Sequence, residues 1–372
     1  MEPSLIKRVL NLAVEIQQIA APTFLEAERA AFVFAAFQEE GLSDLGTDEL
    51  GNVYARLPGE KPGRPVVVTA HLDSVFPPET DLTVDRGADQ ISGPGIGDNA
   101  VGLASLFGIY WSLQPRGLRF PGDLWLVANV GEEGLGNLQG MRVVVERFGN
   151  EPLAYLVLEG MGLGQVYHRA LGVRRYRISA ETAGGHSWVD YGRPSAIHDL
   201  VAVTSRILQL PLPTQPRTTL NVGVFSGGIS INTIASSAEL ELDLRAESLP
   251  VLDRLSKQVE TIVRAANRPG SVLMAEVIGE RPVGGLPEDH PLVALASRSL
   301  EAQGIPPCLG IASTDANVPL SLGYPAVCLG LTTGSGAHTQ EELIHTRPLV
   351  KGLKTVIEVI AGVFSEPGLN GF

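Results

Sequence analysis

Short apolar runs that do not alternate with polar residues mark the first half of the chain and its end. They lie at residues 65–70 (PVVVTA), 124–130 (LWLVANV), 153–158 (LAYLVL) and 325–331 (PAVCLGL). Runs of this kind are typical of strands that helices cover on both faces. Apolar residues at helical spacing, at 5–20 and 101–113, predict such helices. The pattern therefore predicts an α/β fold with a mixed, largely parallel sheet sandwiched by helices.

The middle of the chain follows a different pattern. Residues 174–181 and 238–246 alternate, and in the second stretch Leu240, Leu242 and Leu244 fall on one face with charged residues on the other. Residues 219–225 and 271–278 predict two further strands, and 195–210 and 249–266 have helical spacing. The order β-α-β-β-α-β is that of a split βαβ unit. We therefore expect an inserted α+β domain at 172–286, which interrupts an α/β domain formed by 1–171 and 287–372.

Composition narrows the classes of partner and the compartment. With 28 basic and 41 acidic residues the formal charge is −13, which disfavours nucleic acid and anionic membranes as partners. No apolar stretch approaches the ~18–20 residues that cross a bilayer, and the N-terminal pattern is that of an amphipathic helix rather than a secretion signal. Two cysteines, Cys308 and Cys328, cannot build a disulfide framework. The expected location is the cytoplasm.

Histidines and carboxylates follow the apolar runs directly. They are His71 and Asp73 after the first run, Glu132 and Glu133 at the second, Glu159 after the third and His338 after the fourth, with Asp98 in the glycine-rich stretch GPGIGDNA. Ligands in open α/β sheets gather at the carboxyl ends of the strands, so these side chains are expected to converge.

Two histidines with several carboxylates are the ligand set of a hydrolase with paired divalent metals. The adjacent charges of Glu132 and Glu133 repel each other, and bound cations would neutralise them. One carboxylate beyond the ligands is expected, since the attacking water needs a base. Asp73, two residues after His71, is suited to orient that imidazole.

Two alternatives accompany these interpretations. GIGDNA also matches the dinucleotide fingerprint G-x-G-x-x-A of nicotinamide and flavin enzymes, but that motif directly follows an apolar strand and here polar residues precede it. The histidine of AGGHSW, His186, fits either a functional role or a loop position satisfied by its own hydrogen bonds.

A set of segments resembles the two-zinc family of peptidase T, glutamate carboxypeptidase, aminoacylase, acetylornithine deacetylase and succinyl-diaminopimelate desuccinylase. The segments are TAHLDSV, GPGIGDNAVG, VANVGEEGLG, VLEG, AGGHSW, FSGGISINTI, LDLRAES, STDANVP and GSGAHTQEE, in the family's order from near residue 50 to near residue 345. The resemblance implies a zinc-peptidase-like catalytic domain in 1–171 and 287–372, and it makes the insertion a lid and dimerisation domain.

The resemblance also implies roles for single residues. Two zinc ions per chain, replaceable by cobalt or manganese, would be bridged by Asp98. His71 and Glu159 would complete one site, and Glu133 and His338 the other. Glu132 would be the general base, and the peptide bond between Asp98 and Asn99 would be cis.

In the inserted domain the resemblance implies contacts with the substrate. His186 would stabilise the oxyanion, in its own subunit or across a dimer. Asn232 and Arg245 would lie near the substrate, and Asp315 of the catalytic domain would do so too. For Arg245 an ion pair on its sheet face remains the alternative.

The expected function is di-zinc hydrolysis of an amide bond in short peptides. An N-acyl-amino-acid deacylase is the alternative, since Glu159 resembles carboxypeptidase and deacylase members while the surroundings of Asp315 resemble the peptidase T branch. A non-catalytic binding protein that kept the fold is a third possibility. A homodimer through the lid domain is expected, with a small peptide or N-acyl amino acid as substrate.

Overall fold

The computed structural model describes residues 2–114, 117, 119–366 and 368–369, which divide into two compact units. The first is Met1–Ala170 with Gly284–Phe372, and the second is Leu171–Val283. Each unit has an apolar core of its own. The insertion expected from the sequence, 172–286, begins one residue and ends three residues later than this second unit.

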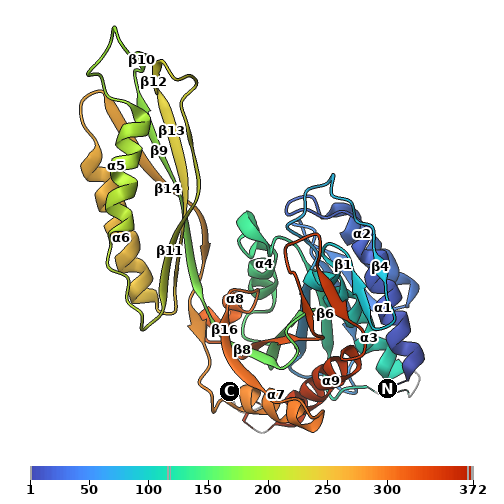
Figure 1. Cartoon of the computed structure of the whole chain (residues 1–372). Helices are drawn as coiled ribbons and strands as arrows, with labels where there is room; N and C mark the ends of the chain where they lie inside the picture. The colour runs from blue at the N-terminus through green and yellow to red at the C-terminus, as the bar shows by residue number, and fades with distance from the viewer. Residues whose placement is uncertain (1, 115–116, 118, 367, 370–372) are drawn as a thin grey trace. The chain divides into compact units, whose positions relative to one another are not determined.

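A sheet of nine strands among the described residues forms the centre of the first unit (Figure 1). The order is β1-β2-β6-β3-β7-β17-β8-β15, and β16 also pairs with β8. The strands are β1 (Ser43–Thr47), β2 (Val53–Leu57), β3 (Val66–His71), β6 (Leu124–Asn129), β7 (Ala154–Glu159), β8 (Gln165–Ala170), β15 (Gly284–Gly285), β16 (Cys308–Ala312) and β17 (Ala326–Gly330).

The four predicted apolar runs form β3, β6, β7 and β17, which are parallel to one another. All six residues of β3 are buried, as expected for a strand covered on both faces. The predicted mixed, largely parallel sheet is confirmed. Because β17 lies between β7 and β8, the C-terminal part of the chain completes a sheet begun by the N-terminal part.

Helices cover this sheet. They are α1 (Pro3–Gln17), α2 (Ala27–Glu39), α3 (Val101–Leu113), α4 (Gln139–Phe148), α7 (Pro291–Ala302), α8 (Asn317–Ser321) and α9 (Leu349–Ser365). Helix α3 packs on β3, β6 and β7 with α1 and α9 beside it, while α4 packs on β6 and against α8. The helix predicted at 101–113 has the bounds of α3, and the one predicted at 5–20 begins and ends two to three residues earlier as α1. None of the helices in the described part of the chain is long and apolar enough to span a bilayer.

A second, small sheet connects the glycine-rich stretch to the segment of His338. Its order is β18-β19-β5-β4, with β4 (Asp85–Arg86), β5 (Gln90–Ser92), β18 (Gly334–Ser335) and β19 (Leu343–His345). The pairing of β5 with β19 sets Ser92 opposite Leu343. Asp98 follows in the turn Ile96–Ala100, whose backbone is not helical at Asp98 and Asn99, and the predicted cis bond between these two residues is present.

The inserted unit has the predicted order β-α-β-β-α-β. Its main elements are β9 (Gly172–Thr182), α5 (Ala196–Leu208), β11 (Thr218–Gly227), β13 (Ser237–Ala246), α6 (Leu249–Ala266) and β14 (Ser271–Arg281), and β10 (Gly185–His186) pairs with β12 (Thr233–Ile234). The sheet order is β11-β13-β9-β14, all antiparallel, and α5 and α6 lie side by side on one face (Figure 1). The leucines of β13 are buried, so the predicted alternation is confirmed.

Candidate metal centre

The carboxyl edge of the central sheet gathers the predicted metal ligands. His71 and Glu159 are the last residues of β3 and β7. Glu133 lies in the loop that follows β6, Asp98 precedes α3, and His338 lies between β18 and β19. Since β3, β6 and β7 are parallel, their ends deliver side chains to one place.

Asp98 is at the centre of this cluster. Its Oδ1 lies 3.0 Å from Nε2 of His71, and its Oδ2 lies 3.1 Å from Nε2 of His338. Glu159 Oε2 is 3.7 Å from His71 Nε2, and Glu133 Oε1 is 3.1 Å from His338 Nε2. Each oxygen of Asp98 therefore faces a different histidine, and each histidine has a second carboxylate beside it.

The donor atoms fit a divalent metal. One atom each of His71, Asp98 and Glu133 lie within 4.8 Å of one another. Imidazole nitrogen and carboxylate oxygen are ligands that zinc and similar cations accept. Several carboxylates confined in one small buried region repel one another unless a cation neutralises them. The residues are thus suited to hold a metal centre.

The pKa values of the two histidines reflect this negative surrounding. Burial alone would lower the pKa of His71, but contacts with carboxylates, Asp73 first among them, outweigh it and raise that pKa well above its usual value. Hydrogen bonding to Asp98 and Glu133 raises the pKa of His338 to about 10. Both imidazoles are therefore surrounded by groups that favour a positive charge at their position.

The pKa values of Glu159 and Asp98 are shifted in opposite directions. Burial raises the pKa of Glu159. Burial also acts to raise the pKa of Asp98, but its hydrogen bonds to His338 and His71 dominate, and the net shift is downward. The two histidines therefore favour the charged form of Asp98.

The sequence predicts that Asp73 orients His71. In the structure Asp73 contacts that imidazole and also binds three further groups. Nδ1 of His71 donates to the backbone carbonyl of Asp73 at 3.0 Å and lies 3.5 Å from the carboxylate Oδ1. The carboxylate accepts the backbone N–H groups of Glu132 and Glu133, at 3.0 and 2.9 Å, and the hydroxyl of Thr23 at 2.9 Å. Because Nδ1 is held by the backbone carbonyl of Asp73, the ring of His71 is oriented with Nε2 facing Asp98.

Asp315 lies beneath the cluster rather than at its surface. It is fully buried and accepts a hydrogen bond from Asn129 Nδ2 at 2.7 Å, and burial raises its pKa to about 7. The substrate contact expected for Asp315 stays a prediction. Asn129 is the last residue of β6, so its hydrogen bond joins Asp315 to the end of the strand that precedes the Glu132 loop.

Three buried charged residues were missed by the sequence reasoning. Glu26 accepts the N–H of Gly131, Arg29 donates to the carbonyls of Ile19 and Leu72, and Glu342 accepts backbone N–H groups beside Asp98. Burial raises the pKa of Glu26, and it raises that of Glu342 to about 7. Glu342 stands within the quoted segment GSGAHTQEE, four residues after His338, which was the available signal.

The other predicted site residues belong to the inserted unit. His186 Nδ1 accepts the backbone N–H groups of Trp188 and Val189, at 3.2 and 3.3 Å, and Asn232 lies in the loop that pairs with this segment. Arg245 donates to Asp243 Oδ1 at 2.7 Å, so an ion pair on its sheet face is present, along its own strand. The predicted substrate roles of these residues stay predictions.

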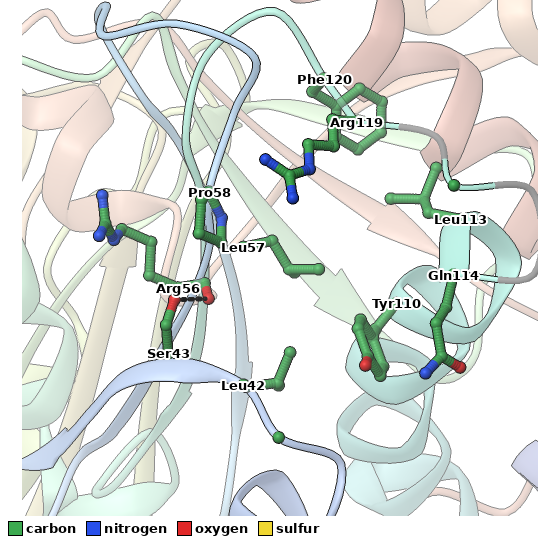
Figure 2. A pocket seen from close by; sticks show the side chains of 12 residues that line it. Leu42, Ser43, Arg56, Leu57, Pro58, Tyr110, Leu113, Gln114, Arg119 and Phe120 are labelled. Carbon is green, nitrogen blue, oxygen red and sulfur yellow. Dashed lines mark hydrogen bonds between the residues drawn. The ribbon is translucent and has the colours of Figure 1, made fainter.

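A cavity of about 390 Å³ lies elsewhere on the first unit (Figure 2). Leu42, Leu57, Leu113 and Phe120 form apolar walls, with Arg119 beside them. Leu57 pairs with Leu124, the first residue of β6, whereas the metal cluster follows the end of that strand. The cavity therefore opens at the opposite edge of the sheet and is separate from the cluster.

Comparison of the sequence with known proteins matches the profile described as Peptidase family M20/M25/M40 over residues 67–362. The uncharacterised protein YqjE of Bacillus subtilis is 24% identical over 371 residues, which cover 95% of this chain and 98% of YqjE. A probable carboxypeptidase of Uncinocarpus reesii is 27% identical over 246 residues, 58% of this chain and 53% of that protein.

Solved structures share the fold over almost the whole chain. Aminopeptidase PepT from Bacillus cereus has a TM-score of 0.76 at 23% identity, covering 96% of this chain and 98% of its own. A tripeptidase from Staphylococcus aureus has a TM-score of 0.78 at 21% identity, covering 97% and 99%. Bacillus subtilis YxeP, described as a dinuclear metal binding peptidase, has a TM-score of 0.72 at 16% identity, covering 98% and 99%.

Proposed function

The chain belongs to peptidase family M20/M25/M40, and from this premise we propose that it is a di-zinc metallopeptidase that hydrolyses an amide bond of short peptides. Relatives of this kind act on C–N amide bonds. One observation carries the proposal: the two oxygens of Asp98 face two different histidines, His71 and His338. A carboxylate in that position suits a bridge between two cations.

His71, Asp98 and Glu159 would hold one metal, and His338, Asp98 and Glu133 the other. When bound, the two cations would polarise the amide carbonyl and lower the pKa of water towards neutrality. Mixed imidazole and carboxylate donors favour zinc, which cobalt or manganese could replace.

Glu132 is the proposed general base. It takes the proton of the attacking water and delivers it to the leaving nitrogen. Its backbone N–H is bound by Asp73, which also binds that of Glu133, so one carboxylate holds the backbone that carries both the base and the ligand.

His186 is the proposed donor to the oxyanion. Because its Nδ1 accepts two backbone N–H groups, the neutral ring carries its proton on Nε2. Nε2–H is then a donor of fixed direction, as stabilisation of a developing oxyanion requires. We propose that this histidine acts in its own subunit or across a homodimer formed by the inserted unit, with Asn232 and Arg245 near the substrate.

Short peptides are the favoured substrates because the aminopeptidase and the tripeptidase resemble this chain over nearly its whole length. An N-acyl-amino-acid deacylase is the second candidate, favoured by Glu159, which resembles that of carboxypeptidase and deacylase members. Two cysteines without a disulfide, one of them buried, agree with a cytoplasmic enzyme.

The test is release of amines from a panel of dipeptides, tripeptides and N-acetyl amino acids by zinc-loaded protein. We expect hydrolysis of peptides with a free amino group, and loss of that activity in a strong chelator. Cleavage confined to acylated amino acids would establish the deacylase instead. Activity that persists after complete metal removal, measured by elemental analysis, would contradict the metal mechanism.

A further inference from the structure

Glu342 is a buried carboxylate whose hydrogen bonds all run towards the segment of Asp98. Oε1 accepts the N–H of Gly97 at 2.6 Å and that of Asp98 at 2.8 Å, and Oε2 accepts the N–H of Gly95 at 3.2 Å. The side chain has no exposed surface. Three backbone donors on one buried carboxylate form a specific anchor rather than a surface contact.

The backbone of Glu342 is held by the same segment. Its carbonyl accepts the N–H of Gly93 at 2.8 Å, and the next residue, Leu343, pairs with Ser92 in the small sheet. The backbone N–H of Glu342 donates to the carbonyl of Thr339, which lies in the same turn as His338. Glu342 therefore connects the turn of His338 to the turn of Asp98.

We propose that Glu342 is a positioning residue of the metal centre, which fixes the backbone of residues 95–98 so that the two oxygens of Asp98 face His71 and His338. The inference rests on the metal centre of the proposed function. His71 and His338 contact the side chain of Asp98, but its backbone lies in a turn rather than in a strand, so no sheet pairing fixes that backbone. The carboxylate of Glu342 fixes that backbone through its three hydrogen bonds and so orients the side chain of Asp98.

The chemistry requires a carboxylate and not an isosteric amide. All three partners are N–H donors, so each bond needs an acceptor oxygen. In Glu342→Gln one of the two oxygens becomes an NH₂ group, which would face a backbone N–H. The turn must then shift, and the oxygens of Asp98 shift with it.

The experiment measures metal affinity on the full chain. Metal-free wild-type protein and Glu342→Gln are titrated with Zn²⁺ against a competing chelator, and the visible spectrum is recorded with Co²⁺. Loss of a residue that orients a ligand typically weakens metal binding about 10–100-fold, and we expect a loss in that range with an altered Co²⁺ spectrum. If Glu342→Gln does not fold, Glu342→Asp, which keeps the charge on a shorter side chain, is measured instead and should lose affinity as well.

Two control variants separate positioning from stability. Glu341→Gln changes the exposed neighbour and should bind Zn²⁺ as the wild type does. Val359→Ala removes methyl groups from a buried site on α9 and should lower the melting temperature without weakening Zn²⁺ binding. The proposal is overturned if the Glu342 variant binds Zn²⁺ within about twofold of wild type, or if Val359→Ala loses as much affinity at an equal loss of stability.

The outcome is separable from that of the proposed function. Wild-type protein that binds two metals but cleaves no amide would refute the peptidase while leaving the role of Glu342 standing. Wild-type protein that binds no metal would refute both.

Discussion

Buried carboxylates fix the backbone of the residues that carry the functional side chains of the cluster. Asp73 binds the N–H groups of Glu132 and Glu133, and Glu342 binds that of Asp98. Hydrogen bonds to a charged acceptor are worth about 1.5–3 kcal/mol each, more than neutral ones. The side chains that would meet metal and substrate can therefore repel one another without displacing the backbone that carries them.

Glu132→Gln should abolish most turnover while leaving the metals bound. The amide keeps the shape of the side chain but cannot take a proton from water, and general base catalysis contributes about 10²–10⁴-fold. We expect kcat to fall by that factor, with the metal content of the purified protein unchanged in elemental analysis. The exposed Glu146→Gln is the matched control and should keep wild-type kcat. A Glu132→Gln enzyme with full activity would assign the base to another group.

At the level of elements, the charged face of β13 in the inserted unit is held together by ion pairs. Asp243 bonds Arg245 along the strand at 2.7 Å and Arg175 of β9 at 3.1 Å. Asp243 and Arg175 are opposite one another in the register of the two strands. The same side chain thus fixes Arg245 and connects two strands.

Asp243→Asn should destabilise the protein near neutral pH and have little effect in strong acid. Burial acts to raise the pKa of Asp243, but Arg245 and then Arg175 outweigh it, so the net shift of the pKa is downward. A lowered pKa in the folded state gives stability that is present above the unfolded value near 3.9 and is lost as the pH falls through the folded value. We expect a loss of about 1 kcal/mol at neutral pH in urea unfolding.

Urea unfolding at a series of pH values shows whether Asp243 stabilises the protein through its charge or through its shape. Glu239→Gln, on the same face of β13, is the control and should change stability less. An Asp243→Asn penalty that stays constant down to strong acid would mean that the carboxylate acts through its shape and not through its charge.

Predictability from sequence differed between elements for physical reasons. The strands β3, β6, β7 and β17 are five or six residues long and mostly apolar, so their composition alone predicts that they are buried. Strands β4, β5, β18 and β19 have two or three residues each, and they exist because segments far apart in the chain pair with one another. No local pattern carries that information.

The same distinction applies to the site. His71, Glu133 and Glu159 could be assigned to one site because each lies at or just after the end of a strand that the sequence predicts. Arg29 and Glu342 were missed because a buried charge looks like a surface charge until its partners are known. Asp315 was found by resemblance, but its burial under Asn129 could not be read from sequence.

At the scale of the whole molecule, the insertion leaves and re-enters the first unit at neighbouring points. Ala170 ends β8 and Gly284 begins β15, and these two residues pair with each other. Paired antiparallel residues have Cα atoms about 5.5 Å apart or less. The residues between them therefore add a unit without separating the strands that flank it.

Replacing residues 171–283 by Asn-Gly should leave a folded first unit. A two-residue turn of this kind joins antiparallel strands. We expect the shortened protein to unfold cooperatively and to bind Zn²⁺, because all five predicted ligands remain. We also expect it to lose amide hydrolysis by about 10²-fold or more, since the donor His186 is gone.

Circular dichroism, Zn²⁺ titration and the substrate panel check these three expectations in turn. Retention of full hydrolysis by the shortened protein would exclude a catalytic role of His186. A shortened protein that does not fold would show that the first unit depends on the insertion.

The position of β17 between β7 and β8 has a consequence for synthesis on the ribosome. When Glu159 has emerged, the partner of β7 on that side is not yet made, because β17 begins only at Ala326. At roughly 5–20 residues per second the wait is on the order of ten seconds or more. During it the apolar strand AYLVLE presents an open edge, the kind that pairs with other chains. The inserted unit is contiguous in sequence and is synthesised completely within this interval, so its strands have all their partners before β7 has its second one.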